Sequence, residues 1–217
     1  AALHGLLAGH DPLDSTSLPD PVADFVSIAK NGSLKGKKLG VIKQLAGEGY
    51  QDGVRTAFTA ALETAAAAGA EIVPIDPFID DALLADMDLF WRVRSWNDLR
   101  VLPIAEQALI LPYIQAWAQG GADVSGTKLM DCYHSVQEIR RRTVAATGDV
   151  DLVLSPVAPD AAFPADQPMP YPDVSQPMGH IGFTMPFNMS EQPAASVHAG
   201  FTDDGRTIGV QIAGRRF

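Results

Sequence analysis

The chain has 217 residues, 47% of them hydrophobic, which is enough to build one α/β domain with a substantial core. Acidic side chains outnumber basic ones by 26 to 16, so the formal net charge is -10. A field of this sign repels nucleic-acid phosphates and anionic lipid surfaces, and we expect neither nucleic acid nor membrane as a partner. The apolar runs are also far shorter than the roughly 20 residues of a membrane-spanning helix.

Cys132 is the single cysteine in the sequence. One cysteine excludes an internal disulfide framework, and it fits a reducing environment, so we expect a cytoplasmic location. A free cysteine usually behaves as a small buried hydrophobe, which is how we interpret Cys132. His134 lies two positions further along a predicted helix and therefore points to another face, which argues against a catalytic cysteine and histidine pair.

Residues 1–33 are interpreted as a helix end followed by a linker. Leu3, Leu6 and Leu7 follow helical spacing from the first residues, which predicts the last turns of a helix that begins before residue 1. Residues 11–21 are rich in Asp, Ser and Pro, so a surface connection is expected there. The sequence stops just after the alternating residues 208–212, and both ends are interpreted as cuts in a longer chain.

Residues 34–79 predict a strand, a helix and a second strand. Residues 38–42 and 70–75 are short and β-rich, and residues 51–68 place apolar side chains on one helical face before Gly69. Such a unit almost always forms a parallel pair of strands, so these two strands are expected to be neighbours in one sheet. Pro74 indicates that the second strand lies at an edge or near its end.

Residues 80–149 are predicted to be helical, and residues 150–217 to contain a strand, a proline-rich loop and a β-hairpin. Gly120 and Gly121 interrupt the helical region, and residues 128–147 resume it as one long amphipathic helix. Residues 150–154 form an apolar β-run, and the prolines between 156 and 177 exclude helix and central strand. Residues 195–201 and 207–213 flank an Asp-Gly turn, which is typical of a hairpin.

Several segments in this order resemble the amidase-signature family. The stretches that carry the resemblance are Leu6 to Ser15, Leu34 to Val41, Gly69 to Val73, Asp151 to Pro156, Phe183 to Asn188, Gln192 to Val197, Gly200-Phe201 and Gly209 to Gly214. The resemblance spans nearly the whole chain and is weakest between residues 80 and 126. It implies a mixed α/β fold, with a β-sheet flanked by helices, present here as the C-terminal part of a single domain in an incomplete fragment.

The family's catalytic Ser-Ser-Lys triad belongs to a glycine- and serine-rich stretch that has no match in these residues. The nearest candidate, residues 120–126, lacks the paired serines. No catalytic residue is therefore assigned here, and we expect the triad upstream of Ala1. What the resemblance implies for this chain is a pocket wall, with Thr184 and Phe187 as substrate-lining residues. The alternative is that Phe187 belongs to the core and Thr184 caps a helix.

Two positions depart from the family pattern, and a third difference concerns one branch of the family. Glu191 stands where glycine is usual, and His198 stands where proline is usual. The glutamine-dependent transamidation subunits of the family carry an aspartate just before the phenylalanine matched by Phe183, whereas residues 179–182 read Gly-His-Ile-Gly. The last difference argues against the glutaminase branch.

Other chemistry is weakly indicated. The aspartates at positions 76, 80, 81, 86 and 88 show no regular metal-ligand pattern, and we interpret them as a solvated face. His180 beside the proline-rich loop is a candidate ligand contact without a partner nucleophile. Gly47-Glu48-Gly49 has too few glycines for a phosphate cradle.

The sequence therefore favours a cofactor-independent amidase, with no metal, that hydrolyses the carbon–nitrogen bond of a small linear carboxamide in a full-length parent. This chain would supply scaffold and part of the pocket and would be inactive alone. The alternative is a naturally short, non-catalytic α/β module that binds a small ligand or a partner chain. Either way, exposed sheet edges predict contact with a missing N-terminal portion or assembly into a homo-oligomer.

Overall fold

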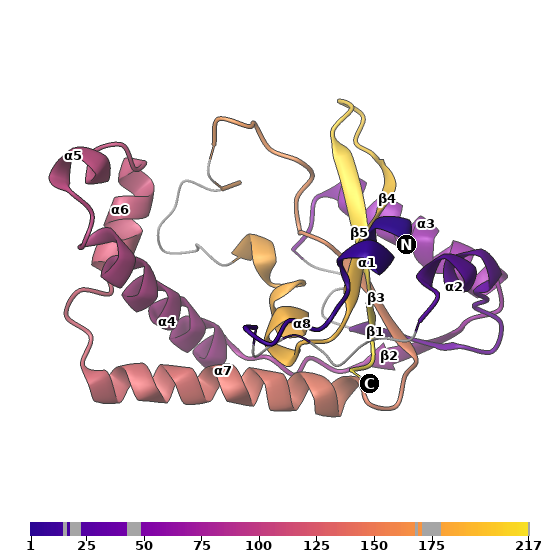
Figure 1. The fold of residues 1–217 in the computed structure, drawn as a ribbon. Helices are drawn as coiled ribbons and strands as arrows, with labels where there is room; N and C mark the ends of the chain where they lie inside the picture. Colours follow the sequence, from indigo (N-terminus) through magenta and orange to yellow (C-terminus); the bar gives the residue numbers. More distant parts are fainter. Residues whose placement is uncertain (15–16, 18–22, 43–48, 168, 171–178, 217) are drawn as a thin grey trace. The chain divides into compact units, whose positions relative to one another are not determined.

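The computed structural model describes residues 1–14, 17, 23–42, 49–167, 169–170 and 179–216 (Figure 1). The chain separates into two compact units, residues 1–35 and residues 36–217. The smaller unit holds helix α1 (Ala2–Leu7) and helix α2 (Phe25–Asn31). Asp24 begins α2 by accepting hydrogen bonds from the backbone N–H groups of Val26 and Ser27. Helix α2 thus lies within the stretch that the composition indicated as a linker. Most of the turn-rich residues 11–21 of that stretch lie outside the described residues.

The larger unit is built on a mixed five-stranded sheet. Its strands are β1 (Lys38–Ile42), β2 (Glu71–Ile75), β3 (Leu152–Pro156), β4 (Ala194–Phe201) and β5 (Thr207–Gly214), in the spatial order β2-β1-β3-β5-β4. Strand β1 pairs in parallel with β2 and with β3, and β5 is antiparallel to both β3 and β4. The predicted parallel pairing of the first two strands is confirmed. Pro74 lies in the edge strand β2, as its missing N–H requires.

Helix α3 (Asp52–Ala67) crosses between β1 and β2 and covers one face of the sheet. Its buried residues pack with Ile208 of β5 and with the loop after β3 in a cluster of Tyr50, Val54, Ala57, Ala161 and Ile208. Helix α8 (Met185–Ser190) covers the opposite face. Its Phe187 contacts Ala213, which is five residues from Ile208 in β5 and therefore points the other way.

The helical section comprises α4 (Asp81–Leu99), α5 (Ile104–Gln107), α6 (Pro112–Gln119) and α7 (Gly126–Thr147). Helix α4 packs against both α6 and α7 (Figure 1). The tryptophans at positions 91, 96 and 117 gather where α4 meets α6. Gly121, just after α6, lies against α4, where a Cβ would come within 2.5 Å of the backbone of Arg92, a clash that only glycine avoids. None of the described helices is long and apolar enough to span a bilayer.

The β4–β5 hairpin confirms the predicted strands and refines the predicted turn. The N–H of Thr202 donates to the carbonyl of Arg206, and the N–H of Gly205 donates to the carbonyl of Thr202. Gly205 has φ of 83°, so it takes the left-handed position that follows a short turn rather than the centre of a two-residue turn. Gly69, with φ of 91°, ends α3 as expected.

Candidate functional site

The candidate site lies at the end of the sheet formed by the carboxyl-terminal ends of the parallel strands β1 and β3. Strand β1 ends at Ile42 and β3 ends at Pro156, and because the two strands are parallel, both residues lie at the same end of the sheet. In open α/β sheets, ligands bind in crevices outside these carboxyl ends. A cavity of about 400 Å³ lies here, between the loop after β3, the short 3-10 helix Gly179–Ile181 and the β4–β5 pair.

The cavity wall is mainly apolar with a few polar side chains. Its lining residues are Val157, Ala158, Asp160, Ala161, Ala162, Phe163, Pro170, His180, Ser196, Val197, His198, Thr207, Ile208 and Gly209. Among these residues Asp160 is the single carboxylate, and His180 and His198 are the two imidazoles. This combination of an apolar wall and a few polar groups is typical of small-molecule sites.

Asp160 is held in place by Gln51 at the start of α3. The Gln51 N–H donates to the carbonyl of Pro159 at 3.0 Å, and the Gln51 side-chain oxygen accepts from the N–H of Ala161 at 3.3 Å. The same loop is tied to β5, because the N–H of Ala162 donates to the carbonyl of Thr207 at 3.3 Å. The backbone on both sides of Asp160 is therefore fixed by elements of the core.

Burial raises the pKa of the Asp160 carboxyl above its ordinary value. A hydrogen bond from the Gln51 side chain and the charges of Arg206 and His180 oppose this shift without cancelling it. Desolvation disfavours the ionised form of a carboxyl group, so a cation that enters the cavity would restore part of the lost solvation.

The segment from Phe183 to Gln192 is tied to β5 by two buried glutamines. Gln211 donates to the carbonyl of Phe183 at 3.0 Å and to the hydroxyl of Ser155 at 3.1 Å. Gln192 donates to the carbonyl of Gly214 at 2.9 Å. Buried amides of this kind are costly to leave unsatisfied, so both ends of the segment have a fixed position on the sheet.

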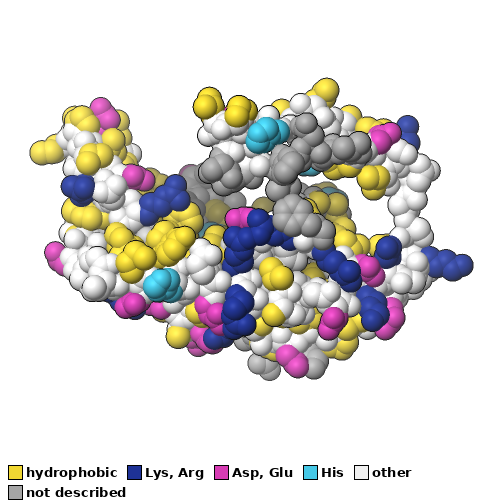
Figure 2. All heavy atoms as spheres, turned by 60° about the horizontal axis from the view of Figure 1, so that its bottom comes forward, with side chains coloured by type: hydrophobic (Ala, Val, Ile, Leu, Met, Phe, Trp, Pro, Cys, Tyr) yellow, Lys and Arg dark blue, Asp and Glu magenta, His cyan; other side chains and the backbone are white. Residues whose placement is uncertain are grey.

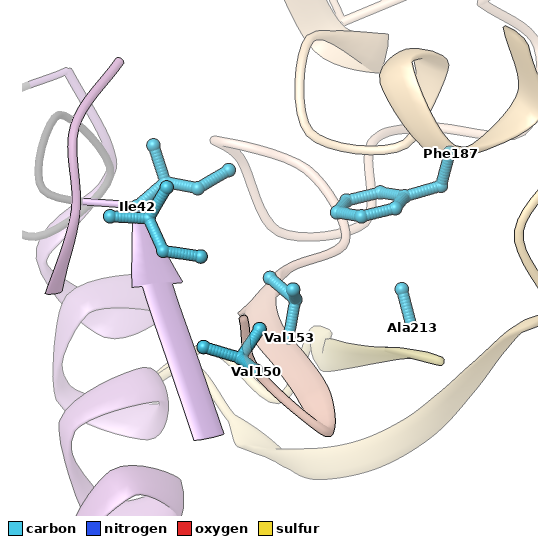
Figure 3. Close-up of a cluster of buried hydrophobic side chains, with 6 residues drawn as sticks. Ile42, Val150, Val153, Phe187 and Ala213 are labelled. Carbon is cyan, nitrogen blue, oxygen red and sulfur yellow. The ribbon is translucent and has the colours of Figure 1, made fainter. Parts of the chain in front are cut away.

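Phe187 and Thr184 take different positions within this segment. Phe187 is 2% exposed and points from α8 into the cluster that contains Ile42, Val153 and Ala213 (Figure 3). Thr184 is half-buried at the N-cap position of α8, where its hydroxyl donates to the carbonyl of Ile181 at 3.2 Å and makes no capping bond. The burial of Phe187 favours a packing role. A small cavity of about 70 Å³ beside Phe183 and Pro186 adjoins the same segment.

The aspartates of residues 76–88 are not the uniformly solvated face that their spacing indicated. Asp80 accepts a hydrogen bond from the N–H of Leu83 and begins α4. Asp86 accepts from Lys128 at 2.6 Å and from Ser135 at 2.7 Å, which joins α4 to α7. Helical periodicity shows which residues share a face but does not show which partner helix supplies a cation, so these contacts could not be read from the sequence.

Asp88 is a further structural carboxylate, because it accepts from Arg92 at 2.6 Å and from the indole N–H of Trp117 at 2.9 Å. Within the part of the chain that the structure describes, no group of three or more His, Cys, Asp or Glu side chains is arranged to hold a metal ion. Cys132 is fully buried, as expected for a core cysteine, and its thiol faces Asp86 at 3.8 Å.

The sequence pointed to one residue of the cavity beside Asp160 and missed another. His180 was identified as a candidate ligand contact and does line the cavity. Asp160 was not identified. The only signal for it was its place a few residues after a strand that ends at the carboxyl edge of a parallel pair, within a proline-rich loop whose path the sequence alone does not give.

Comparison with known proteins identifies the family. The amidase family model matches residues 1–217, the whole of the chain. The chain belongs to the amidase family. Similar curated proteins include the A-type subunits of two bacterial glutamyl-tRNA(Gln) amidotransferases. That of Mycobacterium ulcerans (strain Agy99) is 33% identical over 245 residues, and that of Paenarthrobacter aurescens (strain TC1) is 34% identical over 240 residues. Each alignment covers 98% of this amidase-family chain, but only 49% and 46% of the respective relative.

Solved structures show the same fold. A 6-aminohexanoate cyclic dimer hydrolase complexed with substrate matches with a TM-score of 0.79 and 20% identity, over 99% of this chain and 48% of its own. A bacterial aryl acylamidase of the amidase signature family matches with a TM-score of 0.75 and 23% identity, over 96% of this chain and 45% of its own. The amidase-signature fold expected from the sequence is thus confirmed. The amidase-family chain spans about half the length of the relatives it matches.

Proposed function

We propose that this chain is part of an amidase that hydrolyses the carbon–nitrogen bond of a small linear carboxamide. In this proposal the chain supplies scaffold and part of the substrate pocket, and the nucleophile comes from residues before Ala1. The observation that carries the proposal is the family match over all 217 residues combined with coverage of only 49% of the first relative. The sequence contains no pair of adjacent serines, which fits a triad located elsewhere.

The chemistry follows from the family's Ser-Ser-Lys arrangement. A neutral lysine accepts a proton through the bridging serine, so that the nucleophilic serine can attack the amide carbon. Backbone N–H groups of a glycine-rich turn stabilise the oxyanion, the amine leaves, and water then hydrolyses the acyl-enzyme. In this scheme the chain described here needs to hold the amide against the nucleophile. No cofactor enters the reaction.

Thr184 and Phe187 are the proposed pocket residues of this segment. Thr184 is the better candidate for direct substrate contact because its side chain is only half-buried. Phe187 would act from beneath, since its ring fixes α8 against the sheet. The Gln211 hydrogen bond to Phe183 holds the backbone next to Thr184, which supports a preorganised pocket wall.

Strand β4 is the proposed contact with the preceding portion of the protein. Among the described residues its one strand partner is β5, and none of its eight residues is buried. Val197 and Phe201 are exposed at 44% and 63%. An edge strand of this length with exposed apolar side chains invites further pairing. The alternative pairing partner of β4 is a second copy of the chain, in which case the isolated chain would form a homo-oligomer.

The carboxamide substrate class is proposed rather than a glutamine-dependent transamidation. The named relatives are amidotransferase subunits. In this chain, however, residues 179–182 read Gly-His-Ile-Gly where those subunits are expected to carry an aspartate. Loss of a charged substrate contact changes substrate preference more readily than it changes the fold.

The test is labelling with a fluorophosphonate, which reacts with activated serines. The intact protein should be labelled on a serine upstream of Ala1 and should release amine from simple carboxamides. The isolated chain of 217 residues should stay unlabelled. Amide hydrolysis by the isolated chain, abolished by replacing one of its own serines, would exclude the proposal.

The second candidate is a non-catalytic module that binds a small ligand. The specific observation in its favour is that a cavity of about 400 Å³ is formed by the described residues alone. The labelling experiment separates the two candidates, because a binding module gives no labelled serine in the intact protein.

A further inference from the structure

The cavity beside Asp160 offers a contact that the chemical step of the proposed reaction does not itself require. Eight of its fourteen lining residues are Ala, Val, Ile, Pro or Phe, with Phe163 as the one phenyl ring. Such a surface accepts the apolar body of a small molecule and excludes water from the polar groups around it. Burying an ionised carboxylate in such a wall costs free energy unless a cation compensates its charge.

The position of Asp160 is fixed before any ligand arrives. Gln51 bonds to the backbone of both neighbouring residues, and Ala162 bonds to Thr207 of β5. A carboxylate held by the core loses little conformational entropy on binding, so its interaction with a ligand is not offset by ordering. A carboxylate on a mobile surface loop lacks this advantage.

The Asp160 carboxylate already has polar neighbours. Arg206 and His180 both act on the carboxylate, and Gln51 donates a hydrogen bond to it. The guanidinium of Arg206 is also shared with Asp204, to which its Nε donates at 2.8 Å. Burial nevertheless keeps the pKa of the Asp160 carboxyl above its ordinary value, and a cation in the cavity would lower the cost of the ionised form.

We propose that this cavity binds a protonated primary amine carried on a small apolar or aromatic body, with the ammonium on Asp160 and the body against Val157, Phe163 and Ile208. The inference rests on the proposed amidase function and deepens it, because it makes the preferred amide one that bears a free amino group. The ammonium group is compact, and a single carboxylate can accept a charge-assisted hydrogen bond from it. The two imidazoles and the Ser196 hydroxyl offer further hydrogen bonds to the rest of the ligand.

The test compares two probes of nearly equal shape, benzylamine and benzyl alcohol, by calorimetric or NMR titration of the intact protein near neutral pH. The unaltered protein should bind benzylamine at least about tenfold more tightly, the difference expected for a charge-assisted hydrogen bond. The Asp160→Asn variant should lose about tenfold in benzylamine affinity and keep its affinity for benzyl alcohol. Asp149→Asn makes the same change of charge on an exposed residue just before β3, at the other end of that strand from the cavity. It should alter the affinity for neither benzylamine nor benzyl alcohol.

A second variant tests the place of binding. Ala162→Leu adds bulk to an exposed residue of the cavity wall and should weaken both probes without unfolding the protein. The proposal is overturned if the unaltered protein binds neither probe, if Asp160→Asn leaves benzylamine binding unchanged, or if it weakens both probes equally. This experiment measures ligand binding and needs no catalysis. A negative result would therefore say nothing about serine labelling of the intact protein, so the binding proposal and the amidase proposal can be disproved independently.

Discussion

The guanidinium of Arg140 in α7 donates to the carboxylate of Glu191 at 3.2 Å, at the point where α8 ends. Glu191 has φ of 57°, the left-handed conformation that glycine adopts without strain. Arg216 also bonds to the same carboxylate. Glycine, which the resemblance to the family led us to expect at this position, would adopt this conformation without strain, whereas the glutamate found here has two cationic partners that offset its backbone strain. Figure 2 shows acidic and basic side chains lying next to one another on the side of the molecule that it brings forward.

Glycine and alanine at position 191 should therefore differ in stability. Glu191→Ala keeps the strained backbone and removes both ion pairs, so it should lower the free energy of unfolding by about 1 kcal/mol. Glu191→Gly removes the same pairs but relieves the strain, so it should be more stable than the alanine variant by about 1 kcal/mol. Urea unfolding measures both values. Equal stability of the two variants would contradict the role given to the backbone.

Gln211 should be the most sensitive polar residue of the sheet. Replacing it by Ala removes the donor to the carbonyl of Phe183 and to the hydroxyl of Ser155, so the Phe183 carbonyl loses this bond while the Ser155 hydroxyl still donates to the carbonyl of Pro156. The expected loss is about 1 to 3 kcal/mol in the free energy of unfolding. Gln119→Ala, at an exposed position at the end of α6, is the matched control and should change stability little. A Gln211 variant as stable as that control would show that the buried network does not hold the segment.

Thr184 and Phe187 should separate binding from packing. Phe187→Ala empties part of the core and should cost about 3 to 5 kcal/mol of stability. Thr184→Val keeps the side-chain shape but removes the hydroxyl that donates to the carbonyl of Ile181, so it should cost about 0.5 to 1.5 kcal/mol, while it alters KM of the intact enzyme for its amide. The two measurements are thermal unfolding and steady-state kinetics. An unchanged KM in the Thr184 variant would remove this residue from the proposed pocket.

Glu138 should contribute stability that acid removes. Hydrogen bonds from Arg141 and Arg142 lower the pKa of its carboxyl from 4.5 to about 2. Because the folded pKa lies below the unfolded one, the contribution is complete above about pH 4.5 and is lost as the pH falls towards 2. Glu138→Gln should thus be less stable than the unaltered protein near neutral pH, and the difference should shrink as the pH falls through this window. A difference that stays constant with pH would mean that ionisation of Glu138 is not involved.

The regular elements of this protein could be predicted from local patterns. The strand, helix and strand over residues 38–75 depend on apolar periodicity and on Gly69, which all lie close together in the sequence. The hairpin depends likewise on alternation and on one glycine. These features need no knowledge of long-range contacts, and the structure confirms them.

The site was less accessible to sequence reasoning because its residues meet only through the fold. Asp160, His180 and Ser196 come from a loop, a 3-10 helix and a strand, and no local pattern indicates that they line one cavity. The aspartates of α4 show the same limit, since Lys128 reaches Asp86 across 42 positions. The burial of Phe187 likewise depends on strands that lie both before and after it in the sequence.

The measurement that tests the account most directly is identification of the serine that reacts with a fluorophosphonate in the intact protein, by mass spectrometry of the labelled peptide. The account predicts a labelled serine outside the 217 residues, with none of the serines of this chain modified. A label on one of those serines, at a position whose replacement abolishes amide hydrolysis, would contradict it.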